Sequence, residues 1–398
     1  MKEALLPALQ ALIEQRFRQI SKPLRTNLAV LTVAFLTVLA TVRSGHGRLS
    51  LLALARALPT SGSPHSREKR LHRFLAHPRL DFRTMTTALA TLLLSARHRV
   101  CPILLDQTQS GPAAALVAAV PYAGRALPLA LYTFATPFNE PALNSQNHLE
   151  HLFLLDVETA LPKGVIGVWV ADRGYARSLL LLQSEREGRL YIIRGRTNTI
   201  ITDGQHRMKL GQLKAPLGQA VRYEAVRYHA NRQIRLDVVV YQEGHFQEPW
   251  YLLMPITARS LFSAEQVVNL YRERMQIEQS FRDFKTHLGL RGLHLKVAVP
   301  ARMGRLLLAF CLAYVLCVLL GNSPLGQQAR QLFEIPRRHP RHGTTRTLSA
   351  LTLAMLMLSH SDWIGRSLRY LLRLMARAMQ HHPLLPSNVY LFPPQRAP

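Results

Sequence analysis

Apolar residues in the first hundred positions recur at the three- and four-residue spacing of amphipathic helices. Turn-rich segments at Ser44–Arg48 and Pro59–Pro64 interrupt this pattern. The pattern predicts an all-α N-terminal region with helices at Glu3–Ile20, Asn27–Val42, Leu49–Ala57, Ser66–Ala76 and Phe82–Ala96.

From residue 101 onward the apolar runs become short and are bounded by turn residues, which is typical of buried strands. Two longer periodic stretches, Gln146–Ala160 and Arg177–Glu187, are predicted helices that follow the third and fourth strands. The pattern predicts the order βββ-α-β-α-β, with strands at Pro102–Asp106, Ala114–Val120, Leu127–Ala135, Val165–Ala171 and Leu190–Ile193.

The segment between Gly195 and Pro255 alternates polar and apolar residues, which predicts an inserted antiparallel β region. Helical periodicity then resumes. Ser263 and Gln266 form a capping box for a long helix that runs to about His287. The helix end is marked by Gly289 and Gly292, and a further helix covers Pro300–Leu320. The remainder is predicted to be helical to about Gln380, apart from the basic loop Pro336–Arg346.

The charge balance indicates a polyanionic partner. The chain has 398 residues, of which 50 are Lys or Arg and 23 are Asp or Glu, giving a net charge of +27. Because 48% of residues are hydrophobic and the arginines are scattered, the charge belongs to a folded protein and not to a disordered tail. Nucleic acid is the first expected partner and an anionic membrane surface the second.

Three cysteines, Cys101, Cys311 and Cys317, lie in apolar runs without metal-ligand spacing, which argues against disulfide frameworks and structural zinc. Two apolar stretches, Leu28–Val42 and Leu306–Leu320, each have 15 residues. At 1.5 Å per residue each reaches about 22 Å, short of a ~30 Å hydrocarbon core, so buried helices are expected instead of membrane spans. The first twenty residues do not resemble a signal peptide. We expect a cytoplasmic protein without a membrane partner.

The predicted helix that Ser66 caps displays four basic residues, Arg67, Lys69, Arg70 and Arg73. A solvated amphipathic helix and a helix lying on DNA are equally good interpretations.

Two aspartates, Asp106 and Asp172, stand at the ends of predicted strands. If these strands are neighbours, both carboxylates emerge at the same end of the sheet and repel each other unless a cation lies between them. Oxygen ligands of this kind suit Mg²⁺ or Mn²⁺. The alternative is that each aspartate merely caps or turns a strand end.

The long helix places Tyr271, Arg274, Glu278 and Lys285 within an arc of about 60° at ~100° per residue. A surface helix with an i, i+4 pair between Arg274 and Glu278 is the alternative, and it leaves Tyr271 and Lys285 unexplained.

The spacing Tyr-x2-Arg-x3-Glu-x6-Lys resembles the signature of DDE transposases of the insertion sequence four family, the YREK branch. Asp172-Arg-Gly-Tyr resembles the second-aspartate motif of that family. Leu-Leu-Asp106-Gln-Thr resembles the first, although Gln107 stands where a second acidic residue is often seen. The resemblance covers roughly residues 100–320.

The resemblance implies an α+β fold: a ribonuclease H-like mixed five-stranded core with a β-rich insertion, flanked by all-α regions. It also implies that Asp106, Asp172 and Glu278 hold two divalent ions, Mg²⁺ or Mn²⁺, for DNA strand cleavage and strand transfer. Arg274, Lys285 and Tyr271 would contact phosphates near the scissile position. Trp250 would stack on a flipped base; a core tryptophan on a strand is the alternative.

The implied partners are double-stranded DNA, both terminal inverted repeats and target DNA, and a second copy of the chain that brings two DNA ends together. Three rival functions stay open: a DNA-binding protein or inactive transposase copy, a related metal-dependent nuclease, and a membrane-associated protein. The predicted domains are a helical DNA-binding domain (1–97), the catalytic core in two parts (98–194 and 258–325), the β-rich insertion (195–257) and a C-terminal helical region for dimerisation (326–398).

Overall fold

The computed structural model describes residues 1–43, 49–78, 82–110, 113–140, 143–244, 247–287, 299–335 and 347–386. Four features predicted from the sequence lie outside these residues: the turn Ser44–Arg48, the glycines Gly289 and Gly292, and the loop Pro336–Arg346.

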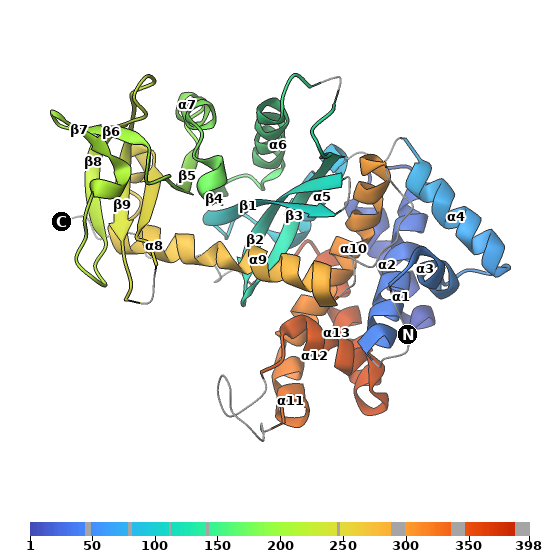
Figure 1. Ribbon diagram of the computed structural model, residues 1–398. Coiled ribbons are helices and arrows are strands. Elements are labelled where there is room, and N and C mark those ends of the chain that lie inside the picture. Colours follow the sequence, from blue (N-terminus) through green and yellow to red (C-terminus); the bar gives the residue numbers. More distant parts are fainter. Residues whose placement is uncertain are drawn as a thin grey trace.

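A ten-stranded mixed sheet forms the centre of the protein, with the order β3-β2-β1-β4-β5-β10-β9-β8-β6-β7 (Figure 1). The first three strands are antiparallel, whereas β1, β4 and β5 are mutually parallel. The predicted mixed α/β fold class is confirmed. The strands are β1 Val100–Ser110, β2 Ala113–Tyr122, β3 Arg125–Ala135, β4 Ile166–Ala171, β5 Leu190–Arg194, β6 Ile200–Asp203, β7 His206–Lys209, β8 Val221–Tyr228, β9 Ile234–Tyr241 and β10 Trp250–Met254.

The strands after β5 do not form a separate sheet. Strand β10 returns to pair antiparallel with β5, through Leu252 with Arg194 and Leu253 with Ile193, and β9, β8, β6 and β7 extend the sheet outward from it. The predicted antiparallel region is therefore present as a continuation of the core sheet. The boundaries of the predicted domains stay predictions.

Helices cover both faces of the central strands (Figure 1). On one side lie α6 Gln146–Ala160 and α7 Ser178–Arg186, and Trp169 of β4 donates a hydrogen bond to Glu158 of α6 at 2.8 Å. On the other side α8 Ala264–Glu273 is followed by α9 Met275–Arg282 and a π-helical turn, η4 Asp283–His287. The predicted capping box of Ser263 and Gln266 is present at the start of α8.

The remaining helices come from the two ends of the chain and pack together beside the sheet (Figure 1). Helix α10 is buried along its whole length from Gly304 and contacts β3, α2 and α12. These helices are α1 Lys2–Arg16, α2 Lys22–Arg43, α3 Leu51–Ala57, α4 Pro64–Ala76, α5 Phe82–Leu93, α10 Pro300–Gly321, α11 Pro324–Phe333, α12 Ala350–Ser359 and α13 Ser361–Met379.

Two expectations about these helices need correction. Helices α2 and α10 each have 22 residues, so the argument that they are too short to span a membrane is wrong. Both are long and apolar enough to span one by length and composition, but 72% and 100% of their apolar windows are buried inside the protein. The N-cap of α4 is Ser63 and not Ser66, and the helix begins at Pro64, two residues before its predicted start. Proline suits the first helical position because the N–H that it lacks would have no hydrogen-bond partner within the helix there.

Candidate active site

Strand register places the two predicted aspartates side by side. Leu105 of β1 pairs with Ala171 of β4 in a parallel ladder, and Asp106 and Asp172 are the next residues on the two chains. Both carboxylates therefore emerge on the same face and at the same end of neighbouring strands, as the sequence predicted. One detail differs: β1 continues past Asp106 to Ser110, because β2 keeps pairing with it.

Backbone amides orient both aspartates. The Oδ1 atom of Asp172 accepts a hydrogen bond from the Gly174 amide at 2.8 Å and caps the short 3₁₀ helix η1 Arg173–Tyr175. The Oδ1 atom of Asp106 accepts one from the Gln107 amide at 2.7 Å. Each carboxylate thus keeps its second oxygen for other partners.

Arg274 connects the strands to the helix that carries Glu278. It lies at the junction of α8 and α9, and its guanidinium is largely buried. Its Nη2 donates to Oε1 of Glu278 at 2.5 Å, and its Nη1 lies 3.8 Å from Oδ2 of Asp106. The predicted i, i+4 pair is present, and it also reaches a carboxylate 168 positions earlier in the chain.

The carboxyl group of Asp106 has a raised pKa. Burial raises its pKa to about 6, against the opposing effects of the Gln107 amide and the Arg274 cation. The negative charges of Asp172 and Glu278 raise this pKa further. The three predicted carboxylates therefore share one electrostatic environment, in which Arg274 is the nearby cation.

This arrangement is not a closed metal site. Within the described ranges of the chain, no three His, Cys, Asp or Glu side chains are grouped tightly enough to hold a metal ion. Arg274 pairs with both Asp106 and Glu278 instead. The donor set still fits a hard divalent cation, because it consists of carboxylate oxygens. The raised pKa of Asp106 also means that its negative charge is only partly balanced by Arg274 and the Gln107 amide. The Glu278 side chain, which is 42% exposed, has room to change partner.

The other predicted DNA contacts on α8 and β10 lie in an aromatic cluster. Tyr271 is only 2% exposed, and its ring meets that of Trp250 edge to face at 4.9 Å between centroids. Trp250 also lies 6.2 Å from the ring of Tyr241 and is partly exposed. In this structure Trp250 therefore makes core contacts, and its stacking on a base stays a prediction.

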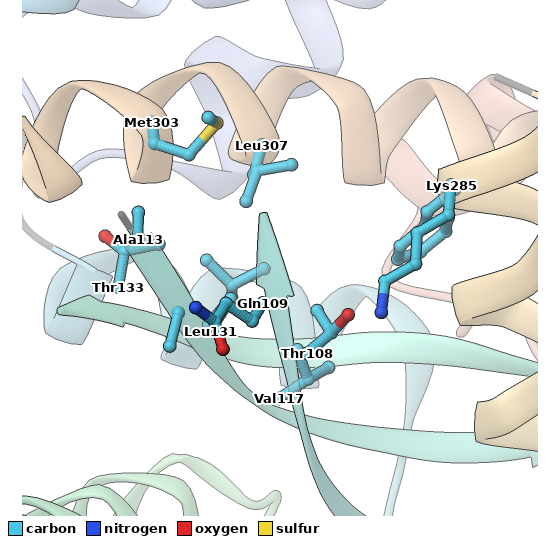
Figure 2. Close-up of a pocket in the computed structure, with 12 residues that line it drawn as sticks. Thr108, Gln109, Ala113, Val117, Leu131, Thr133, Lys285, Met303 and Leu307 are labelled. Atoms are coloured by element: carbon cyan, nitrogen blue, oxygen red, sulfur yellow. The ribbon is translucent and has the colours of Figure 1, made fainter. Parts of the chain in front are cut away.

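Lys285 lies on η4, so the predicted stripe does not run along one regular helix. Figure 2 shows its side chain extending towards Thr108, two residues beyond Asp106 on β1. Both residues line a mainly apolar pocket between the sheet and α10, together with Leu131 and Leu307. The π turn changes the angular position of Lys285 but leaves it on the carboxylate side of the sheet.

Sequence reasoning missed a partly buried polar network behind the aspartates. Gln146 donates hydrogen bonds to Gln107 at 2.8 Å and to Glu150 at 3.0 Å, and Glu150 pairs with Arg177. Burial raises the pKa of Glu150, whose side chain is 2% exposed. The network joins α6 to the residues that follow Asp106 and Asp172. A usable signal was the acidic residue on the apolar face of the predicted helix Gln146–Ala160.

The basic residues of α4 divide into two pairs. Lys69 and Arg73 are exposed. By contrast, Arg70 donates to the Asn27 side chain at 2.7 Å and Arg67 to the Arg56 carbonyl at 3.3 Å. The structure therefore leaves Lys69 and Arg73 more accessible to a ligand than their two neighbours.

Comparison with known proteins gives one family. Residues 145–316, somewhat less than half of the chain, match a family described as "Transposase DDE domain". The matched range contains Asp172, Trp250 and Glu278 and begins after Asp106. No curated protein matches the chain.

Proposed function

We propose that this protein is a DNA transposase that cleaves at the ends of an insertion sequence and joins them to target DNA. The observation that carries the proposal is the parallel register of β1 and β4, which sets Asp106 beside Asp172 within reach of Arg274 and Glu278. The transposase DDE domain match over residues 145–316 supports the same reading. The β1–β5 order supports a ribonuclease H-like core, and the Tyr271, Arg274, Glu278 and Lys285 spacing supports the YREK branch.

Asp106, Asp172 and Glu278 would hold two divalent ions, Mg²⁺ or Mn²⁺. Such ions activate water and stabilise both the attacking and the leaving oxygen of a phosphodiester. Burial and two neighbouring carboxylates raise the pKa of Asp106 to about 6, so a bound cation would stabilise the charged form of this side chain.

Arg274 holds Glu278 before DNA arrives, because its guanidinium pairs with the carboxylates of both Glu278 and Asp106. When a DNA phosphate enters, Arg274 can exchange the Glu278 carboxylate for the phosphate. The planar carboxylate and the tetrahedral phosphate both accept hydrogen bonds from the N–H groups of the guanidinium. Glu278 is then released towards Asp106 and Asp172. Lys285, whose side chain extends towards Thr108 of β1, supplies a second cation for the phosphates beside the scissile one.

The substrate is double-stranded DNA, and two copies of the chain would bring two ends into one complex. The net charge of +27 supports a polyanionic substrate. The exposed Lys69 and Arg73 of α4 give the N-terminal helices a surface for phosphate contacts.

The test is strand cleavage of a plasmid that carries the DNA flanking the gene, with Mg²⁺ or with EDTA, by wild type, Glu278→Gln and Glu265→Gln. Glu265 is exposed on the first turn of α8, so its substitution makes the same chemical change outside the site. We expect Mg²⁺-dependent cuts at two defined ends by wild type and Glu265→Gln. Glu278→Gln should bind the DNA without cutting it.

Equal cleavage by wild type and Glu278→Gln would remove Glu278 from the reaction. Tight binding by all three proteins without any cleavage would replace the transposase proposal by one of DNA binding alone. Cuts spread over the plasmid instead of at two ends would favour a metal-dependent nuclease.

A further inference from the structure

Three arginines form a row across the outer strands of the sheet. Arg207 of β7 and Arg227 of β8 both pair with Thr202 of β6, one from each side, and Arg227 pairs with Arg235 of β9. Directly paired residues share a face of the sheet, so the three side chains project from the same surface. At about 4.8 Å between strands, the row is roughly 14 Å long.

The row is unfavourable for the fold by itself. All three arginines are exposed, and none has a carboxylate partner among the residues with described positions. Two like charges in directly opposed positions of an antiparallel ladder repel each other. Lys209, two residues after Arg207 on β7, lies on the same face of the sheet and is also exposed. Such a concentration of cations favours the binding of an anion.

Asp203 follows Thr202 on β6 and projects from the opposite face of the sheet, whereas two carboxylates near the row, Asp237 and Glu224, are already paired. Asp237, two residues beyond Arg235, is fully buried and accepts from Arg259 at 2.7 Å and from the Ala225 amide at 2.9 Å. Glu224 pairs with the same Arg259 at 2.8 Å. The arginine row therefore faces solvent without a counter-charge from these two groups.

The row lies on the same face of the sheet as the candidate active site. Alternation along β9 puts Arg235 on one face with Tyr241, which pairs with Trp250. Continued pairing through Leu252, Arg194 and the strands beyond places Asp106 and Asp172 on that face as well. Helix α8 covers this face at β9 and β10, whereas β6, β7 and β8 lie beyond it at the end of the molecule (Figure 1).

We propose that Arg207, Arg227 and Arg235, with Lys209, bind the phosphate backbone of the DNA duplex whose end is cut at the carboxylates. The inference rests on the proposed function and adds a surface to it. Duplex DNA carries about one negative charge per 1.7 Å of its axis with both strands counted, so a duplex segment as long as the row carries roughly eight phosphate charges. A rigid strand register fixes the cations in place, which suits positioning of a duplex and not recognition of its bases.

The test compares DNA binding by wild type, Arg227→Gln/Arg235→Gln and the control Lys163→Gln/Arg186→Gln over a range of salt concentrations. The control residues are exposed, lie in the loop before β4 and in the last turn of α7, and lose the same two charges. Each phosphate contact contributes about 0.9 to the slope of log K against log salt. We expect the slope of the arginine variant to be shallower by about 2, and that of the control to be unchanged.

Urea unfolding without DNA separates binding from a structural role. Removal of the opposed charges should leave the unfolding midpoint of the arginine variant unchanged or raise it, while DNA binding weakens. A lowered midpoint together with weaker binding would overturn the inference, as would an unchanged salt slope or an equal loss in the control. If wild type itself binds no DNA, the proposed function fails as well; if wild type binds and cuts while the arginine variant binds equally, only this inference fails.

Discussion

Replacement of Asp106 by asparagine should stabilise the protein at neutral pH. The pKa of Asp106 is about 6 in the folded chain, against about 3.9 in an unfolded chain. Between these values the folded state binds more protons than the unfolded state, so the free energy of unfolding falls as pH rises from about 4 to about 6 and stays lower above that. Two pKa units correspond to about 3 kcal/mol. Asparagine has the same size and no proton to lose.

Urea unfolding of wild type and Asp106→Asn in EDTA, at pH 4 and at pH 8, measures this effect. The difference in unfolding free energy between the two proteins should favour the variant by about 2 to 3 kcal/mol more at pH 8 than at pH 4. Asp362→Asn is the matched control, because its side chain is 80% exposed. A difference between wild type and Asp106→Asn that is the same at both pH values would refute the reasoning.

Addition of Mg²⁺ should reduce the stability advantage of Asp106→Asn at pH 8. An ion bound only by folded wild type adds about 2.7 kcal/mol at a hundredfold excess over its Kd, and Asp106→Asn should gain less. An equal gain by both proteins would mean that Asp106 is not a ligand.

Two further substitutions test the supports of the site. Arg125 donates to the buried carboxylate of Asp283 at 2.6 Å, and Asp283→Asn removes the charge of that partner. The substitution should lower the free energy of unfolding by about 3 kcal/mol or more in urea denaturation. A change below about 1 kcal/mol would contradict the pairing. Gly321→Ala puts a Cβ 1.9 Å from the Ala350 carbonyl oxygen. It should force α10 and α12 apart and lower the free energy of unfolding by about 1–3 kcal/mol. The control Gly365→Ala, on the exposed side of α13, should be neutral or stabilising. Equal effects of the two glycine substitutions would argue against close contact of α10 and α12.

Periodicity was sufficient for the elements that local pattern controls. The predicted helix Gln146–Ala160 has the observed bounds, and the strand order through β5 is as predicted. Element ends that depend on a partner were less predictable. Strand β1 extends to Ser110 because β2 continues to pair with it, and nothing in its own residues marks that end. The N-terminal start of α4 depended on Pro64 and was set too late.

The site was predictable where it follows from spacing along one element. The pairing of Arg274 with Glu278 follows from their separation on a helix, and the nearness of Asp106 and Asp172 follows once β1 and β4 are neighbours. The contact between Arg274 and Asp106 depends on how α8 packs on the sheet, so the sequence could not supply it. The role of these residues in DNA cleavage stays a prediction until it is measured.

The return of β10 to β5 has a consequence for a chain that is still being synthesised. Arg194 and Leu252 are partners in the finished sheet, and at about 5–20 residues per second the ribosome needs roughly 3–12 s to make the residues between them. For that time β5 is an open edge with unpaired backbone groups, which is the kind of edge that recruits other chains. A polypeptide that stops inside this interval never acquires β10, so truncated products of the gene should be prone to aggregation and to removal by proteases.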